Sequence, residues 1–316
     1  MNKGAKTALK LVAGSAIAYF AVGEAIYERL LNRRFTGINN SNRIIEPDLH
    51  KYYGKPEDYV EADAWFVAVN PEDTVLVSSK GKNMHSRIIM QKDYTEKWAI
   101  VIHGYTSNSR GMAEQAFYFY KKGFNVLLPD LVSFGADEQK YCSMGYHDKD
   151  YIKDWVRYIV SLDENAKIAL LGVSMGSATT MLTTGENDLL PNVKCAVADC
   201  GYTSVWEEYS TQCKVTYKLP AFPFMNAANT VSKLRGNFDF KKCSPIDAVA
   251  RSKTPTLFIH GECDEFVPYW MMDKLFAACT AEKEKLSVPG TAHANSCYTQ
   301  PELYYSTVDR FVDKYI

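Results

Sequence analysis

A serine stands between two glycines in a Gly-x-Ser-x-Gly pattern formed by Gly172, Ser174 and Gly176. The pattern follows an apolar run at residues 167–171 and precedes a segment able to begin a helix. Glycines at these two places allow a sharp strand-to-helix turn, because a side chain there would collide with neighbouring backbone. The turn would expose the Ser174 hydroxyl as a nucleophile, and the backbone N–H of Met175 could face a developing oxyanion.

A serine hydroxyl needs an imidazole to accept its proton and a carboxylate to orient that imidazole. After a turn of this kind the partners follow in the order serine, acid, histidine. Of the six histidines, only His260 and His293 come after Ser174. His293 follows the apolar run at residues 286–288 and is the predicted base, whereas His260 lies inside a strand-like run and is predicted to be structural.

Asp264 is the predicted acid, since it follows the apolar run at residues 256–260 and would lie at the carboxyl end of a strand. It could instead cap a surface helix. Glu262, Glu265 and Asp199 remain alternatives, and Asp199 is the best of them because it ends the preceding strand.

A second oxyanion donor is expected in the loop after the first central strand. That loop begins with His103, Gly104 and Tyr105. Gly104 permits a tight turn, so the backbone N–H of Tyr105 is the predicted partner of the Met175 N–H. His103 is expected to brace the loop.

The elements that must position these residues alternate between short apolar runs and helix-spaced patterns, which is typical of a parallel sheet covered on both faces. Buried strands are predicted at residues 98–103, 125–129, 168–173, 195–198 and 256–260. Three earlier strands are expected at residues 64–69, 74–78 and 86–91. We expect the sheet to begin with an antiparallel arrangement of these strands. Helices are expected at residues 111–122, 149–161, 269–280 and 301–316.

Residues 203–250 break this alternation and are predicted to form a small helical lid, too short for an independent domain. Four aromatic residues of this segment are candidates for the substrate pocket: Trp206, Tyr217, Phe222 and Phe224. Aromatic side chains also dominate ordinary cores, so these four could equally bury the lid against the body.

The N-terminus departs from the composition of the rest. Three lysines within the first ten residues precede an uncharged apolar stretch at residues 11–23, and the first acid is Glu24. We expect residues 1–34 to form a single retained anchor in the cell membrane, since snorkelling lysines and residues 25–27 could lengthen a stretch shorter than the ~20 residues of a span. Basic residues at both ends leave the side of the catalytic domain open. Two alternatives fit the same residues. They could be a signal peptide that is cleaved from a secreted protein, or an amphipathic helix that packs on the domain of a cytoplasmic protein.

Charge and cysteine content exclude several classes. Lys and Arg number 36 against 37 for Asp and Glu, without a long basic run, which argues against nucleic acid as a partner. The eight cysteines include no Cys-x-x-Cys pair, so we expect free thiols, no metal site and no cofactor. A disulfide bond between Cys263 and Cys297 is conceivable.

Together these motifs resemble the α/β-hydrolase superfamily, and in particular the small-lid bacterial esterases related to cinnamoyl esterases and serine aminopeptidase-like hydrolases. The resemblance runs from about residue 60 to the C-terminus. It implies an α/β fold with a mostly parallel central sheet, helices on both faces and a small helical lid, within a hydrolase domain at residues 35–316. It also implies the roles assigned above: Ser174 as nucleophile, Asp264 and His293 as its partners, and Tyr105 and Met175 as oxyanion donors. Residues 131–135 depart from the Leu-Arg-Gly-His-Gly of many relatives.

The expected activity is that of a carboxylesterase that forms an acyl-enzyme from a small-molecule ester or acyl substrate. A thioesterase, an acyltransferase and a peptidase acting on short peptides share this chemistry and stay open. The peptidase is less favoured, because neither a propeller domain nor a long acidic lid is apparent. A membrane-anchored scaffold with an inactive hydrolase fold is the alternative outside enzymes, and the intact Ser174, Asp264 and His293 argue against it.

Overall fold

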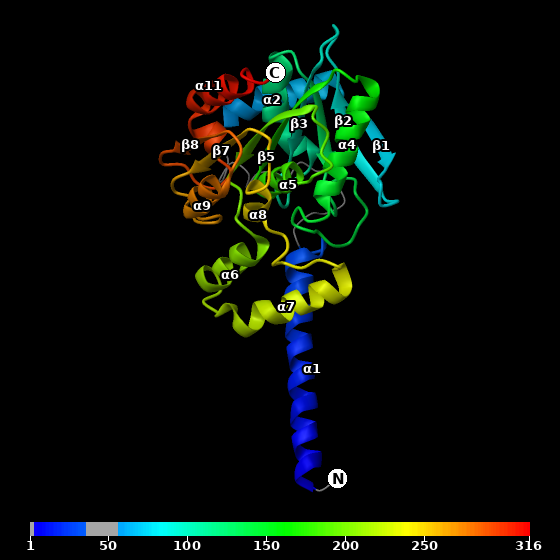
Figure 1. The fold of residues 1–316 in the computed structure, drawn as a ribbon, viewed down its shortest axis with the longest axis vertical. Coiled ribbons are helices and arrows are strands. Elements are labelled where there is room, and N and C mark those ends of the chain that lie inside the picture. The colour runs from blue at the N-terminus through cyan, green and yellow to red at the C-terminus, as the bar shows by residue number, and fades with distance from the viewer. Residues whose placement is uncertain (1–2, 36–55) are drawn as a thin grey trace.

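The fold was taken from a computed structural model that describes residues 3–35 and 56–316. An eight-stranded sheet in the order β1-β2-β4-β3-β5-β6-β7-β8 forms its centre (Figure 1). β1 pairs antiparallel with β2 and β2 with β4, whereas the pairings among β3 to β8 are all parallel. The strands are β1 Glu72–Val77, β2 Asn83–Ile89, β3 Lys97–Ile102, β4 Asn125–Asp130, β5 Lys167–Val173, β6 Val193–Asp199, β7 Thr256–Gly261 and β8 Lys283–Val288.

The central strands are apolar throughout because both faces of the sheet are buried. In β3, Trp98 and Ile100 point into one apolar cluster, while Ala99 and Val101 point into the other. The first cluster is completed by α4 Asp148–Leu162 and α5 Met175–Thr184, and the second by α3 Ala113–Lys121 and α11 Pro301–Val312. The predicted α/β sheet with helices on both faces is therefore confirmed.

Residues 64–69, predicted to be a strand, belong to helix α2 Pro56–Val69, so that prediction is wrong. Apolar side chains recur there with helical spacing: Ala62 and Phe66 are both buried, and Trp65 packs 5.0 Å from the Phe117 ring of α3. A short apolar run fits either a strand or a buried helix face, and contact with α3 decides in favour of the helix.

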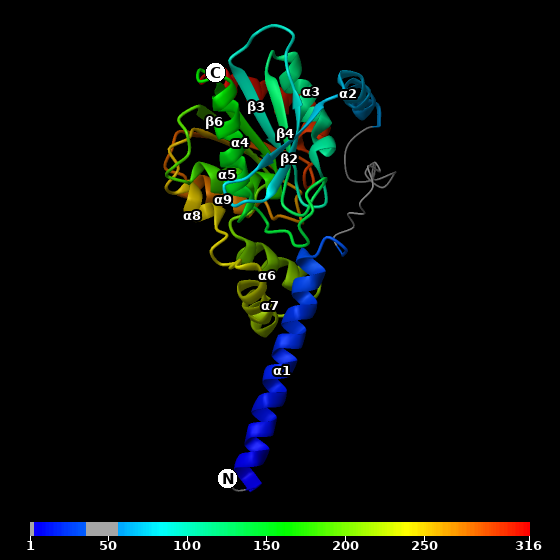
Figure 2. The same cartoon turned by 90° about the vertical axis from the view of Figure 1, so that its right-hand side faces the viewer.

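Residues 203–250 contain three helices, α6 Val205–Val215, α7 Ala221–Gly236 and α8 Pro245–Val249. Two of them, α6 and α7, lie off one end of the sheet beside α1 Lys3–Leu31, as both views show (Figures 1 and 2). The third, α8, packs on the body, since a side chain at Gly185 after α5 would meet Ala248. We refer to α1, α6 and α7 together as the helical cover.

Helix α1 is long, but its two halves differ. Its C-terminal half packs on α7, where a side chain at Gly23 would collide with the Ala227 carbonyl, and Tyr27 and Leu31 are fully buried. Arg235 of α7 contacts the carboxylates of Glu24 and Glu28. The N-terminal half extends away from the body (Figure 2).

Within residues 3–35 and 56–316, no helix combines the length and apolarity needed to cross a membrane. The prediction that residues 1–34 anchor the chain in the cell membrane is therefore wrong. The residues expected to lengthen the apolar stretch pack against protein instead, since Tyr27 lies in the core and charged Glu24 and Glu28 pair with Arg235. Residues 36–55, assigned to the start of the hydrolase domain, lie outside the described residues.

Candidate active site

Ser174 occupies a strained turn between β5 and α5, with φ 57° and ψ −114°. Two glycines make the turn possible: a Cβ on Gly172 would lie 2.1 Å from the Gly176 carbonyl, and one on Gly176 would lie 2.1 Å from the Ile102 carbonyl. Met175 is the first residue of α5, so its N–H has no partner within the helix. The serine is only 7% exposed, contrary to the open hydroxyl expected from the motif.

Ser174, His293 and Asp264 form one hydrogen-bonded chain. Nε2 of His293 lies 2.8 Å from the Ser174 Oγ, and Nδ1 lies 2.6 Å from Oδ2 of Asp264. With Nδ1 donating to the carboxylate, Nε2 is free to accept the serine proton, which is the tautomer that a general base requires.

Asp264 is fixed by its own loop after β7. Its Oδ1 accepts backbone N–H bonds from Phe266 and Val267, both at 2.9 Å, and its Oδ2 lies 3.1 Å from His260 Nε2. Burial alone would raise the pKa of Asp264, but the hydrogen bonds from His260 and His293 outweigh burial and hold the pKa below its usual value. Asp264 therefore stays ionised, as a group that stabilises an imidazolium must.

The alternative acids lie elsewhere. Asp199 is buried at the end of β6, where its carboxylate accepts from Ser296 Oγ at 3.5 Å. Burial raises the pKa of Asp199 to about 7, so this carboxyl is poorly suited to hold a permanent charge beside an imidazole. Glu262 and Glu265 are both exposed.

The loop after β3 lies beside the nucleophile. A Cβ on Gly104 would be 3.4 Å from the Ser174 Cβ, so the backbone of this loop approaches the serine closely. His103 braces the loop as expected: its Nε2 accepts the Leu131 N–H at 3.0 Å and its Nδ1 lies 2.7 Å from the Gly104 carbonyl.

The hydroxyl of Tyr105 donates to the Leu30 carbonyl of α1 at 2.7 Å. Phe134, from the segment that departs from the pattern of many relatives, packs edge-on against the Tyr105 ring at 5.7 Å. Sequence reasoning missed both contacts, because neither Leu30 nor Phe134 stands near residues 103–105 in the sequence.

Comparison with known protein families places these residues in context. The prolyl oligopeptidase family matches residues 112–316, a segment that includes Ser174, Asp264 and His293 and begins after Tyr105. The chain belongs to the prolyl oligopeptidase family. It is a hydrolase of the α/β-hydrolase superfamily, which confirms the resemblance found in the sequence, and the inactive-scaffold alternative gains no support.

Individual relatives of this prolyl oligopeptidase family member are distant. The uncharacterised Bacillus subtilis protein YqkD is 26% identical over 240 residues, covering 76% of this chain and 78% of its own. The Pyrococcus furiosus esterase Pf2001 superposes with a TM-score of 0.64 at 20% identity, over 87% of this chain and 97% of its own. The Pyrococcus horikoshii acylaminoacyl peptidase superposes with a TM-score of 0.57 at 16% identity, over 77% of this chain and 41% of its own chain. The solved structures support the shared fold.

The four aromatic pocket candidates lie at different places in the helical cover. Trp206 lines an open hollow between α6 and the start of α7, and Lys241 Nζ sits 4.3 Å from the centre of its ring. Phe222 is exposed and Phe224 is half-buried. Tyr217 is exposed.

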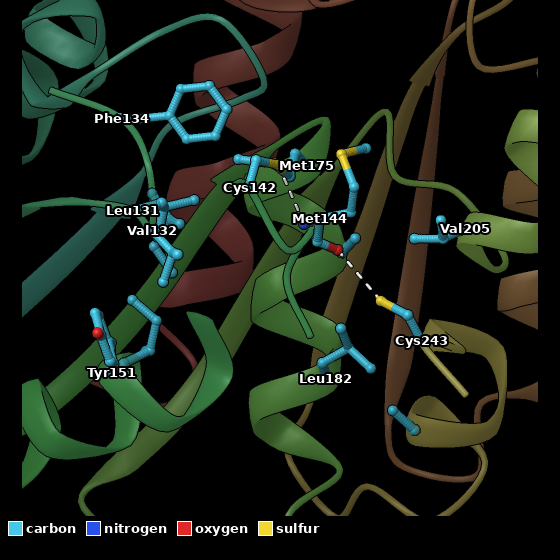
Figure 3. Close-up of a cluster of buried hydrophobic side chains, with 14 of the residues drawn as sticks. Leu131, Val132, Phe134, Cys142, Met144, Tyr151, Met175, Leu182, Val205 and Cys243 are labelled. Atoms are coloured by element: carbon cyan, nitrogen blue, oxygen red, sulfur yellow. Dashed lines mark hydrogen bonds between the residues drawn. The ribbon is translucent and has the colours of Figure 1, made fainter. Parts of the chain in front are cut away.

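A group of buried sulfur atoms lies beside Met175, the first residue of α5 (Figure 3). Cys142 Sγ lies 3.8 Å from Met175 Sδ and accepts the Met144 N–H at 3.3 Å, while Cys243 Sγ donates to the Met144 carbonyl at 3.3 Å. Val205 of α6 joins the same cluster. The start of α6 and the residues around Met175 therefore belong to one apolar core.

All eight cysteines are free thiols, with Cys263 exposed and Cys297 buried, so the conceivable bridge between them is absent. Within the described ranges, one group of three side chains could hold a metal ion: Cys200, Asp264 and His293, whose ligand atoms lie within 4.8 Å of one another. Asp264 and His293 are already bonded to each other, so an ion there would compete with the arrangement that serves Ser174.

Proposed function

We propose that this protein is a carboxylesterase that cleaves small-molecule esters through an acyl-enzyme on Ser174. The observation that carries the proposal is the continuous hydrogen-bonded chain from Ser174 through His293 to an ionised Asp264. Such a chain activates a hydroxyl for attack on a carbonyl.

In the first step Ser174 Oγ attacks the ester carbonyl while His293 Nε2 takes its proton. The N–H groups of Tyr105 and Met175 would stabilise the oxyanion, because both belong to segments adjoining Ser174 and the Met175 N–H has no helical partner. The imidazolium then protonates the departing alcohol. Water repeats the sequence with His293 as base, releasing the acid and restoring Ser174.

The test is hydrolysis of p-nitrophenyl esters from acetate to palmitate, with Ser174→Ala as the variant. We expect kcat to fall by about 10⁶-fold, because removing the nucleophile leaves only residual stabilisation. Labelling of Ser174 by a fluorophosphonate provides a readout that does not depend on substrate choice. Ester turnover that survives in Ser174→Ala would contradict the proposal.

Peptide hydrolysis is the second candidate, and the family match is the observation that favours it. A short peptide p-nitroanilide in the same assay separates the two. Faster cleavage of the anilide than of every ester, with the same dependence on Ser174, would replace the esterase proposal by the peptidase.

A further inference from the structure

Cys200 is a buried thiol beside the catalytic residues that the mechanism above does not use. It follows β6 with φ 46°, is 1% exposed, and its backbone N–H donates to the Ile259 carbonyl of β7 at 2.8 Å. Burial raises the pKa of the thiol well above its usual value, as do nearby carboxylates, whereas the main-chain N–H groups of Ala294 and Ser174 lower it. The sulfur therefore lies against the backbone of the nucleophile and of the residue that follows the base.

Three different kinds of donor atom meet at this place. The ligand atoms of Cys200, Asp264 and His293 lie within 4.8 Å of one another, and His293 Nδ1 is 2.6 Å from Asp264 Oδ2. In a tetrahedral zinc site with bonds of about 2.0–2.3 Å, neighbouring donor atoms are about 3.5 Å apart. Shifts of about 1 Å would therefore bring a sulfur, a nitrogen and an oxygen to the separations that Zn²⁺ requires.

The carboxylate of this group is already oriented from outside. Oδ1 of Asp264 accepts the backbone N–H groups of Phe266 and Val267, and Oδ2 lies 3.1 Å from His260 Nε2. Such outer partners orient a metal ligand and strengthen its bond to the ion. The His293 side chain is 21% exposed, whereas that of Asp264 is enclosed, so an ion would enter by way of the imidazole.

The donor set and its charge select the metal. Zn²⁺ bound to one thiolate and one carboxylate has no net charge, which suits a buried site because an uncompensated charge there is costly. Mg²⁺ and Ca²⁺ take oxygen ligands and would leave the sulfur unused. Three protein ligands also leave the fourth position of Zn²⁺ for a water molecule.

Resting on the proposed ester hydrolysis, we propose that Cys200, Asp264 and His293 form an inhibitory Zn²⁺ site. The ion takes the place of the proton between His293 Nδ1 and Asp264, that proton moves to Nε2 through solvent, and the Cys200 thiol releases its own proton to solvent. Nε2 then carries hydrogen and donates to Ser174 Oγ, so it cannot accept the serine proton. Removal of the ion by a chelator reverses these proton transfers.

The test is hydrolysis of p-nitrophenyl acetate by the full chain, with free Zn²⁺ set by a metal buffer. We expect micromolar Zn²⁺ to inhibit the wild type and a chelator to restore its activity. Cys200→Ser should need at least about 100-fold more Zn²⁺, because losing a partner outside the ligand sphere already costs about 10–100-fold. Cys263→Ser removes the exposed thiol that precedes Asp264 and is the matched control, which should keep the wild-type sensitivity.

Equal zinc inhibition of wild type and Cys200→Ser would overturn the inference, as would a wild type that responds only to millimolar Zn²⁺. Thermal unfolding and fluorophosphonate labelling without zinc check that the variants are folded. If Cys200→Ser does not fold, Co²⁺ replaces Zn²⁺ as the probe. The thiolate-to-cobalt charge-transfer absorption should then appear in the wild type and persist in Cys263→Ser, and its absence from either protein would refute the site.

Failure of the proposed function gives a different result from failure of the zinc site. If no ester is turned over, the esterase proposal fails, and zinc binding is read from fluorophosphonate labelling of Ser174 instead. Micromolar Zn²⁺ should slow this labelling in the wild type and in Cys263→Ser, but not in Cys200→Ser. Equal slowing in all three proteins would show that the ion inhibits without Cys200, and the inference would be wrong.

Discussion

The group formed by Ser174, Asp264 and His293 and the helical cover are assembled in different ways. Each triad residue follows a strand of one parallel sheet, so short local motifs suffice to place Ser174, Asp264 and His293. The cover joins segments more than 200 residues apart, through contacts such as Tyr19 with Thr230 and Arg235 with Glu28. The comparison teaches that local sequence positions Ser174, Asp264 and His293, whereas long-range packing assembles the helical cover.

The largest expected effect separates the two buried aspartates of the catalytic region. Asp264→Asn should lower kcat/KM for a p-nitrophenyl ester by about 10⁴-fold, because His293 loses the carboxylate that fixes its tautomer. Asp199→Asn is the matched control and should cost less than about tenfold, since the Asp199 carboxylate bonds with Ser296 and Tyr304 and not with His293. If the two variants lost kcat/KM to the same extent, Asp199 would take a direct part in proton transfer between Ser174 and His293.

The next effect tests whether α1 is an integral part of the fold. Tyr27 is 1% exposed and its ring packs 5.0 Å from that of Tyr141, so Tyr27→Ala should lower the free energy of unfolding by about 3 kcal/mol. Urea denaturation measures the change. If stability is unaltered and only α1 becomes protease-sensitive, the helix docks independently of the body.

A smaller effect probes the link between cover and site. Tyr105→Phe keeps the backbone N–H but removes the hydroxyl bond to Leu30, worth about 1 kcal/mol. We expect kcat to fall by up to about tenfold with little change in KM, because the oxyanion loop is less well held. A change confined to KM would indicate that the hydroxyl meets substrate instead.

The smallest effect concerns the outer half of α1. Ile17 is 70% exposed, and Ile17→Ser should change the free energy of unfolding by less than about 0.5 kcal/mol. The same urea measurement, set beside Tyr27→Ala, checks the division of the helix into two unlike halves. A large loss of unfolding free energy in Ile17→Ser would mean that the surface around Ile17 is covered in solution.

The sheet and the meeting of Ser174, Asp264 and His293 were within reach of sequence reasoning, because apolar runs and the Gly-x-Ser-x-Gly turn are local signals. Residues 64–69 were misassigned because a short apolar run does not distinguish a strand from a buried helix face. The proposed anchor failed because composition does not reveal that Tyr27 packs in the core.

The bond from Tyr105 to α1 ends on the main-chain carbonyl of Leu30, not on a side chain. Any residue at position 30 presents the same acceptor, so substitution there leaves the bond available and places no selective pressure on the identity of its partner. Co-variation between positions 30 and 105 should therefore be absent in an alignment of relatives. An alanine scan of α1 would likewise leave this bond intact, so among substitutions within α1 only those that move the helix axis would reveal it.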